Sequence, residues 1–106
     1  GFAIRIVNLY KFLYKEERVM SKQLLRSGTA IGAISEEAIG AQSTSDFINK
    51  LSIAYKETRE TLYWLRLLKS TEYLSDIQFD SIYKDGEEII KILTSIIKSS
   101  KEKNNK

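Results

Sequence analysis

The side chains in this sequence best suited to chemistry are two pairs of glutamates. Glu36 and Glu37 are adjacent, and Glu57 and Glu60 are three residues apart. Helical bundles can hold di-iron centres between such glutamates, but only together with two Glu-x-x-His pairs. The sequence has no histidine, so that ligand set cannot form, and an all-carboxylate site is the remaining alternative. We expect no metal and no other cofactor, and ion pairs between these glutamates and the cations Arg26, Lys56 or Arg59.

Nucleophilic catalysis also lacks its components. Serine and threonine are plentiful, but there is no histidine to activate one of them and no cysteine to supply a thiolate. The stretch 27–32 contains two glycines, yet it lacks the Gly-x-x-x-x-Gly-Lys-Ser/Thr order of a phosphate-binding loop. We therefore predict a protein that is not an enzyme and has no catalytic residues.

Basic residues form two lines that could contact phosphates. The first line lies opposite the apolar side of the first expected helix and consists of Lys11, Lys15 and Arg18. The second occupies one sector of the third expected helix, around Tyr63, and consists of Lys56, Arg59 and Arg66. Basic groups near an aromatic ring suit phosphate contact and base stacking. A solvated charged face is the alternative interpretation of each line.

The charge of the chain is unevenly distributed. The formal net charge is +3, and residues 98–106 account for all of it, whereas residues 71–97 carry two lysines against six acids. For the second basic line to bind a polyanion, the acidic fourth helix must face away from it. Residues 99–106 are polar without apolar periodicity, so we expect a single domain over residues 1–98 followed by a frayed tail.

Composition and apolar spacing both favour helices. The chain of 106 residues has no proline, which otherwise interrupts long elements. Apolar residues spaced four and three apart predict one helix face. In the first helix these are Phe2, Ile6, Leu9 and Leu13. The longest uncharged run, 27–35, is too short to span a bilayer. No signal peptide is visible, which predicts a cytoplasmic location.

The second expected helix is rich in small residues. We expect it to begin after an N-cap at Ser21 and to end near Gln42. Glycine costs a helix about 1 kcal/mol relative to alanine. Close approach of a neighbouring helix at Gly28 and Gly32 would offset that cost, whereas the alternative is that the glycines only loosen the helix.

The third expected helix has two apolar sides. Ser43 and Asp46 form its start, since both suit a helix N-terminus. One stripe consists of Leu51, Tyr55, Thr58, Leu62 and Leu65. The opposite side consists of Ile53, Trp64 and Leu67. The first stripe should face the core, and the second side is a candidate oligomer interface.

The fourth expected helix opens with a capping box, Ser75 and Gln78. Its apolar line consists of Phe79, Ile82, Gly86, Ile89, Leu93 and Ile96. Short connections between consecutive helices force neighbours to be antiparallel. The sequence therefore predicts an all-α, antiparallel up-down-up-down four-helix bundle.

Four stretches resemble the signature of a bacterial family of four-helix-bundle proteins, which are encoded by intervening sequences in 23S ribosomal RNA genes. The stretches are 22–33, 36–38, 46–54 and 56–65, and the resemblance covers nearly the whole chain. Ile34-Ser35 departs from the expected Asn followed by an apolar residue. The positions that match the motif and read as structural are Arg26, Gly28, Gly32, Glu37, Glu57 and Trp64.

The resemblance implies a ring-like homopentamer. It also implies kinship with accessory proteins of diversity-generating retroelements, which work with a reverse transcriptase and bind nucleic acid through a basic surface. It brings no established activity. The sequence thus leads to the hypothesis of a non-enzymatic homo-oligomer that associates with RNA or DNA. The alternative is an oligomeric scaffold that binds a protein partner, such as a reverse transcriptase, without touching nucleic acid.

Overall fold

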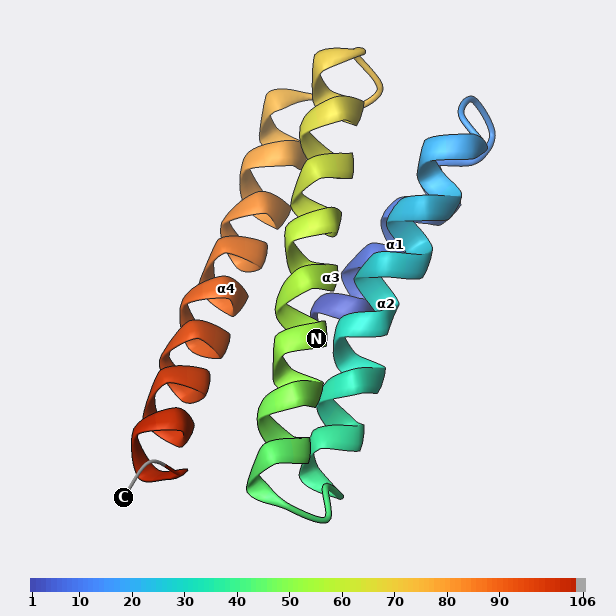
Figure 1. The fold of residues 1–106 in the computed structure, drawn as a ribbon. Coiled ribbons are helices and arrows are strands. Elements are labelled where there is room, and N and C mark those ends of the chain that lie inside the picture. Colours follow the sequence, from blue (N-terminus) through green and yellow to red (C-terminus); the bar gives the residue numbers. More distant parts are fainter. Residues whose placement is uncertain (105–106) are drawn as a thin grey trace.

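The fold is an antiparallel bundle of four helices, described by a computed structural model over residues 1–104 (Figure 1). The helices are α1 (Phe2–Leu13), α2 (Val19–Ile39), α3 (Thr44–Ser70) and α4 (Asp76–Asn104). Together they form a rod of 51 × 20 × 19 Å. Residues 1–104 contain no strand, and the prediction of an all-α four-helix bundle is confirmed.

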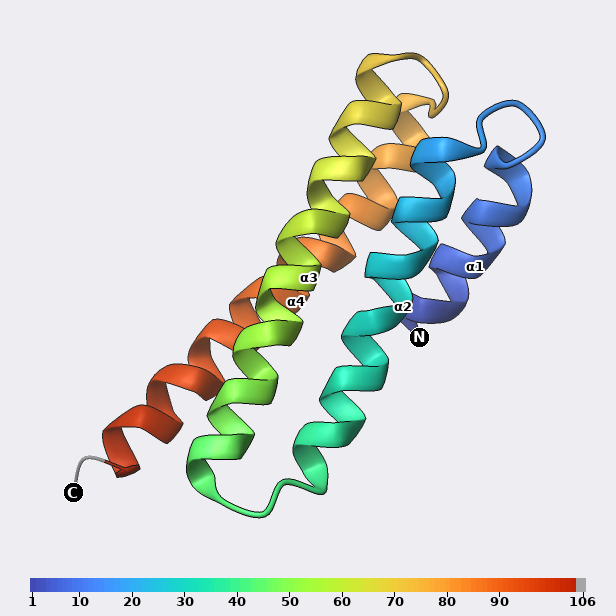
Figure 2. The same ribbon diagram turned by 45° about the vertical axis from the view of Figure 1, so that its right-hand side comes forward.

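The four helices do not all run the full length of the rod. α3 packs along both α2 and α4, and α1 packs on α2 and touches α4 (Figure 2). Within residues 1–104 the backbone of α1 does not approach α3, and that of α2 does not approach α4. Because α1 has only 12 residues against 21, 27 and 29 in the others, it accompanies them over one half of the rod. We call this the α1 half, and the other the open half.

Two clusters of buried side chains form the core. The cluster in the α1 half is built around Ile6, Leu24, Leu65 and Leu68, all fully buried. The cluster in the open half is smaller and contains Ala38, Leu51, Ala54 and Leu93. The predicted core stripes of α1 and α3 are buried or half-buried throughout. In α4, Ile96 at the end of the predicted line is exposed.

Two of the three predicted N-caps are confirmed. The Ser43 hydroxyl accepts a hydrogen bond from the Asp46 amide at 3.0 Å, and Ser75 and Gln78 bond each other's amides reciprocally. The prediction of Ser21 as N-cap is wrong, because α2 begins two residues earlier and Ser21 is buried in its first turn. The Glu17 carboxylate accepts from the amides of Met20 and Ser21 instead, since an acid satisfies free amides as a hydroxyl does.

Two helix ends differ from the sequence prediction. α2 ends at Ile39 rather than near Gln42, with Gly40 as its C-cap. α4 continues through Asn104, past the expected domain boundary at residue 98. The predicted frayed tail, 99–106, therefore falls mainly on the last turns of α4, and its final two residues lie outside the described range. Fraying of these turns stays a prediction.

The turn between α3 and α4 has a backbone conformation that suits glycine. Glu72 has φ of 68°, in the left-handed region. Its amide donates to the carbonyl of Lys69, and the Tyr73 amide donates to that of Leu68. This pair of bonds is a Schellman motif, which ends α3 and turns the chain toward α4. None of the helices described combines the length and apolar character needed to cross a bilayer.

Candidate nucleic-acid interface

A basic patch lies where α3 and α4 run side by side in the open half. A hollow of about 460 Å³ lies at this seam. Its lining includes Ser52 and Tyr55 from α3 and Lys98 and Lys101 from α4. Lys56 follows Ser52 by one helical turn and Arg59 follows Tyr55 by one turn, so both flank the same seam. We name Lys56, Arg59, Lys98 and Lys101 the seam patch.

All four cations of the seam patch are exposed, and none forms an ion pair within residues 1–104. By contrast, Arg5, Arg26, Lys50 and Lys69 are each paired with an acid. One acid, Glu102, also lines the hollow. Four unpaired cations beside an aromatic ring form a surface that can contact two or more phosphates of a polyanion.

The sequence predicted Lys56 and Arg59 as nucleic-acid-binding residues, but not Lys98 and Lys101. Lys98 was the last residue of the expected domain and Lys101 lay in the expected tail, whereas α4 continues through both and places them beside α3. Ile97 carried the signal, because it is apolar and lies one turn before Lys101, so the apolar stripe reaches the predicted boundary. Extending the fourth expected helix by one turn beyond residue 98 places Lys101 at the seam.

Arg66, the last member of the second basic line, is held by α4. Its guanidinium donates to the Tyr83 hydroxyl at 2.8 Å and lies 6.0 Å from the centre of that ring. The expectation that the acidic fourth helix faces away from this line is therefore wrong at Arg66. α3 lies between α2 and α4, so one flank of α3 must border α4.

The first basic line is separate from the second. Lys11 is exposed at the end of α1, and Lys15 and Arg18 are exposed in the turn that follows. Since the backbones of α1 and α3 do not approach each other within the described chain, the structure does not join the two lines into one surface. Each would have to contact a nucleic acid independently.

The glutamate pair of α3 forms ion pairs rather than a metal site. The Arg26 guanidinium donates to Glu57 at 3.2 Å and to Glu60, and the Trp64 indole donates to Glu60 at 3.0 Å. Burial opposes the charge of Arg26, but the bonds and charges of Glu60 and Glu57 outweigh it and raise the pKa of the guanidinium. Glu37 pairs with Lys50 at 3.4 Å. No group of three or more potential ligands in residues 1–104 is placed to hold a metal ion.

The predicted oligomer interface on α3 is only partly open. Ile53 is exposed, whereas Trp64 and Leu67 are half-buried. Trp64 packs against the core cluster of the α1 half in addition to its bond to Glu60. Trp64 thus contributes to its own bundle, and a role in contacts between copies stays a prediction.

The two motif glycines differ in their surroundings. A Cβ atom placed on Gly28 would lie 2.7 Å from Cγ2 of Ile6, so the predicted close approach of a neighbouring helix is confirmed there. The same expectation is wrong for Gly32, where nothing within 4 Å would meet a Cβ. Gly32 lies one turn beyond Gly28, where the N-terminal residues Gly1, Phe2 and Ala3 line a groove together with it and do not pack on it.

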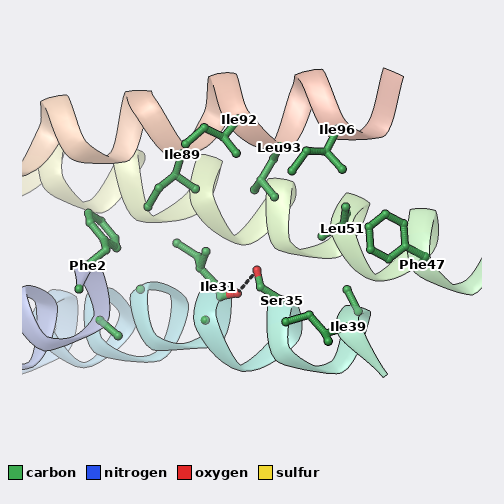
Figure 3. A pocket seen from close by; sticks show the side chains of 15 residues that line it. Phe2, Ile31, Ser35, Ile39, Phe47, Leu51, Ile89, Ile92, Leu93 and Ile96 are labelled. Atoms are coloured by element: carbon green, nitrogen blue, oxygen red, sulfur yellow. Dashed lines mark hydrogen bonds between the residues drawn. The ribbon is translucent and has the colours of Figure 1, made fainter. Parts of the chain in front are cut away.

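Gly32 instead lines an apolar groove between α2 and α4 in the open half (Figure 3). The groove has a volume of about 550 Å³ and begins beside the N-terminal end of α1, at Phe2. Figure 3 shows Ile89, Ile92 and Ile96 of α4 on one wall, facing α2, with residues of α3 at the floor. The apolar spacing in the sequence did not predict this groove.

Comparisons with known proteins agree with this architecture. Residues 1–95 match the family model of the 23S rRNA-intervening sequence protein. The chain is also similar to a crystal structure from Bacteroides thetaiotaomicron, described as a protein with unknown function from the S23 ribosomal protein family. The two are 64% identical with a TM-score of 0.90, over 92% of each chain. No functionally curated protein matches. The chain therefore belongs to the 23S rRNA-intervening sequence protein family.

Proposed function

We propose that this protein is a non-enzymatic homo-oligomer that binds RNA or DNA through phosphate contacts with little sequence preference. The observation that carries the proposal is the seam patch, four exposed cations from two helices that form no ion pair within residues 1–104 and flank the seam that holds Tyr55. Lysine and arginine bind phosphate by releasing counterions, which requires no base-specific geometry. Lys11, Lys15 and Arg18 form a second, smaller contact surface.

Self-association is part of the proposal because one protomer offers few phosphate contacts. Repeating the seam patch in every copy adds contacts along one polyanion, and avidity then exceeds the affinity of a single copy. The family resemblance favours a five-fold ring. Of the three residues predicted for this contact on α3, Ile53 is the exposed one, whereas Trp64 and Leu67 are half-buried.

The test is the binding of a labelled single-stranded RNA of about 20 nucleotides of mixed sequence, followed by fluorescence anisotropy. At about 50 mM salt the protein should bind, and affinity should fall steeply as salt rises. Lys98→Glu with Lys101→Glu should weaken binding about tenfold or more. The matched control is Lys22→Glu with Lys91→Glu, which changes the net charge equally at exposed positions outside the seam patch.

A protein that forms an oligomer but shows no binding at this salt concentration would contradict the nucleic-acid part of the proposal. The oligomeric scaffold for a protein partner would then be the better account. Equal losses in the seam variant and the control would show that net charge, rather than the seam patch, determines binding. In both cases light scattering of the same samples separates loss of binding from loss of assembly.

A further inference from the structure

The hollow at the seam of α3 and α4 has a lining that suits a nucleobase. It combines an aromatic and an apolar side chain, Tyr55 and Ile97, with two hydroxyl side chains, Ser52 and Thr94. Its volume of about 460 Å³ falls within the roughly 300–1,000 Å³ of small-molecule sites. We propose that this hollow takes one unstacked base of a single-stranded nucleic acid, while the seam patch holds the phosphates on either side of it.

The bundle holds Tyr55 in position for such a contact. The side chain is half-buried and packs against the core cluster of the open half, which includes Leu51, Ala54 and Leu93. A ring that is already fixed by packing loses little conformational freedom when a base stacks on it. Every base has a π-face, so stacking on an aromatic ring tolerates any sequence. The contact therefore agrees with binding of little sequence preference.

The hydroxyl groups in the lining can bond the edge of the base. The Ser52 hydroxyl donates to the carbonyl of Ile48 at 2.8 Å, which leaves its oxygen free to accept from a second donor. Thr94 is exposed, and a hydroxyl both donates and accepts. Groups of this kind bond any of the bases, so they add affinity without selecting one base over another.

Two contacts define how α3 and α4 are aligned. Leu62 lies against Gly86, and the Arg66 guanidinium bonds the Tyr83 hydroxyl. Because the helices are antiparallel, residues at equal separations from Leu62 toward its N-terminus and from Gly86 toward its C-terminus lie at the same level. At 1.5 Å per residue, Tyr55 is about 11 Å from this common level.

The cations of the seam patch lie at the two ends of the hollow. From the same level, Arg59 and Lys56 lie at about 5 and 9 Å, before Tyr55. Lys98 and Lys101 lie at about 18 and 23 Å, beyond it. The centres of the two pairs are therefore about 13 Å apart along the rod. An extended strand spans this distance with about two nucleotides, so a base between two held phosphates lies over the hollow.

The local charge also suits a polyanion. Residues 47–56 of α3 and the stretch of α4 at the same level, 92–101, contain no acid and four lysines. One of these lysines, Lys50, pairs with Glu37 of α2. Glu102 also lines the hollow and is one acid against the four cations of the seam patch. Glu87 follows Gly86 directly, so it lies before the stretch begins.

A base in the hollow distinguishes a single strand from a duplex. The bases of a duplex are paired and stacked, and taking one out of the stack costs free energy. Phosphate contacts alone favour the duplex, because it has the higher charge density. A preference for the single strand therefore requires a contact with a base. This inference rests on the proposed function and names its substrate.

The first experiment compares a labelled RNA strand of about 20 nucleotides with the same strand annealed to its complement, by fluorescence anisotropy at equal salt. The single strand should bind about tenfold tighter or more. Tyr55→Leu should abolish this preference by weakening binding of the single strand. Binding of the duplex and the dependence on salt should stay unchanged, because all four cations remain.

Two further variants serve as controls. Tyr55→Phe keeps the ring and should keep most of the preference. Tyr63→Leu removes an exposed tyrosine from the same helix, about 12 Å from Tyr55 along α3 and outside the hollow. It should leave the preference unchanged. Circular dichroism of each variant shows whether the bundle is intact.

The second experiment uses the unmodified chain, so it does not depend on how a variant folds. A single strand that carries iodouridine at its central positions is bound and irradiated, which joins the modified base to an aromatic side chain in contact with it. Mass spectrometry of the digested complex should place the cross-link on Tyr55. Cross-links on other aromatic residues alone would overturn the assignment of the base to this hollow.

The outcomes separate this inference from the proposed function. Equal binding of both forms, with no effect of Tyr55→Leu, would overturn the base site and leave the phosphate contacts of the seam patch standing. An equal loss in Tyr55→Phe and Tyr55→Leu would overturn the stacking contact, and a loss of the same size in Tyr63→Leu would overturn the choice of the hollow. No binding of either form at about 50 mM salt would overturn both the base site and the proposed function.

Discussion

Ile6 of α1 fills the space in which a side chain on Gly28 of α2 would stand. The distances from a Cβ at position 28 to Cγ2 and Cγ1 of Ile6 would be 2.7 and 2.8 Å. These are branch atoms next to the backbone of α1, so they cannot move aside without moving the helix. The missing side chain thus sets how close the short first helix lies to the rest of the bundle.

Gly28→Ala should therefore destabilise the protein. Overpacking a core contact costs about 1–3 kcal/mol, against a gain of about 1 kcal/mol from the better helix propensity of alanine. Gly32→Ala is the matched control, because nothing in the protomer would meet its Cβ. It should raise the free energy of unfolding by up to about 1 kcal/mol. Urea unfolding measures both, and a stabilising Gly28→Ala would contradict the packing described.

Glu72→Gly should stabilise the protein. Glu72 holds φ of 68° at the end of α3, where glycine has no steric penalty and residues with a Cβ lose about 1 kcal/mol. The gain should therefore be up to about 1 kcal/mol, measured as a shift of the thermal midpoint. Glu72→Ala removes the same charge but keeps the Cβ. If alanine stabilises as much as glycine, the backbone explanation is wrong.

Arg26→Ala should change the fluorescence of the single tryptophan as well as the stability. Removing the guanidinium leaves Glu57 and Glu60 unpaired, and Glu60 accepts the indole hydrogen bond of Trp64. The ion pairs are partly exposed, so the loss should be about 1 kcal/mol. Arg26→Lys should recover part of it, because one ammonium cannot reproduce the two-pronged contact. Unchanged emission in Arg26→Ala would show that the Glu60–Trp64 bond does not depend on Arg26.

The last turns of α4 should exchange their amide hydrogens much faster than the turns around Leu93. Leu93 is buried against the core of the open half, whereas Lys101, Glu102 and Lys103 are exposed. Hydrogen exchange followed by mass spectrometry measures the difference. Slow exchange over residues 99–104 would contradict the expected fraying.

Apolar periodicity was sufficient to predict the fold because each helix buries one stripe. Ile6, Leu62 and Leu93 were all placed on core faces from their spacing alone, and the structure buries them. Capping was predictable where a hydroxyl bonds an amide three residues on, as at Ser43 and Ser75. The prediction failed at Ser21, because α2 begins earlier and the Glu17 carboxylate accepts from the amides of its first turn. The sequence does not show which side chain caps these amides.

The surfaces were less predictable because they depend on helix lengths and on pairs of helices. Lys101 lies at the same seam as Lys56 only if α4 continues beyond its apolar stripe. The apolar groove exists only because α1 is shorter than its neighbours. One signal was present in the sequence. The first apolar stripe spans 12 residues and the fourth nearly 20, so one corner of the bundle must be occupied over only part of its length.

The fully buried hydrogen bond from Thr61 to Ser27, at 2.9 Å, joins α2 to α3 near the middle of both helices. Those two helices are consecutive, and they share the most extensive contact of the bundle, so they can form early from contacts between nearby parts of the chain. α1 has only a short contact with α4, which must close over most of the chain. The contact between α1 and α4 is thus expected to be the last to form, after α1 has paired with α2 and α4 has paired with α3.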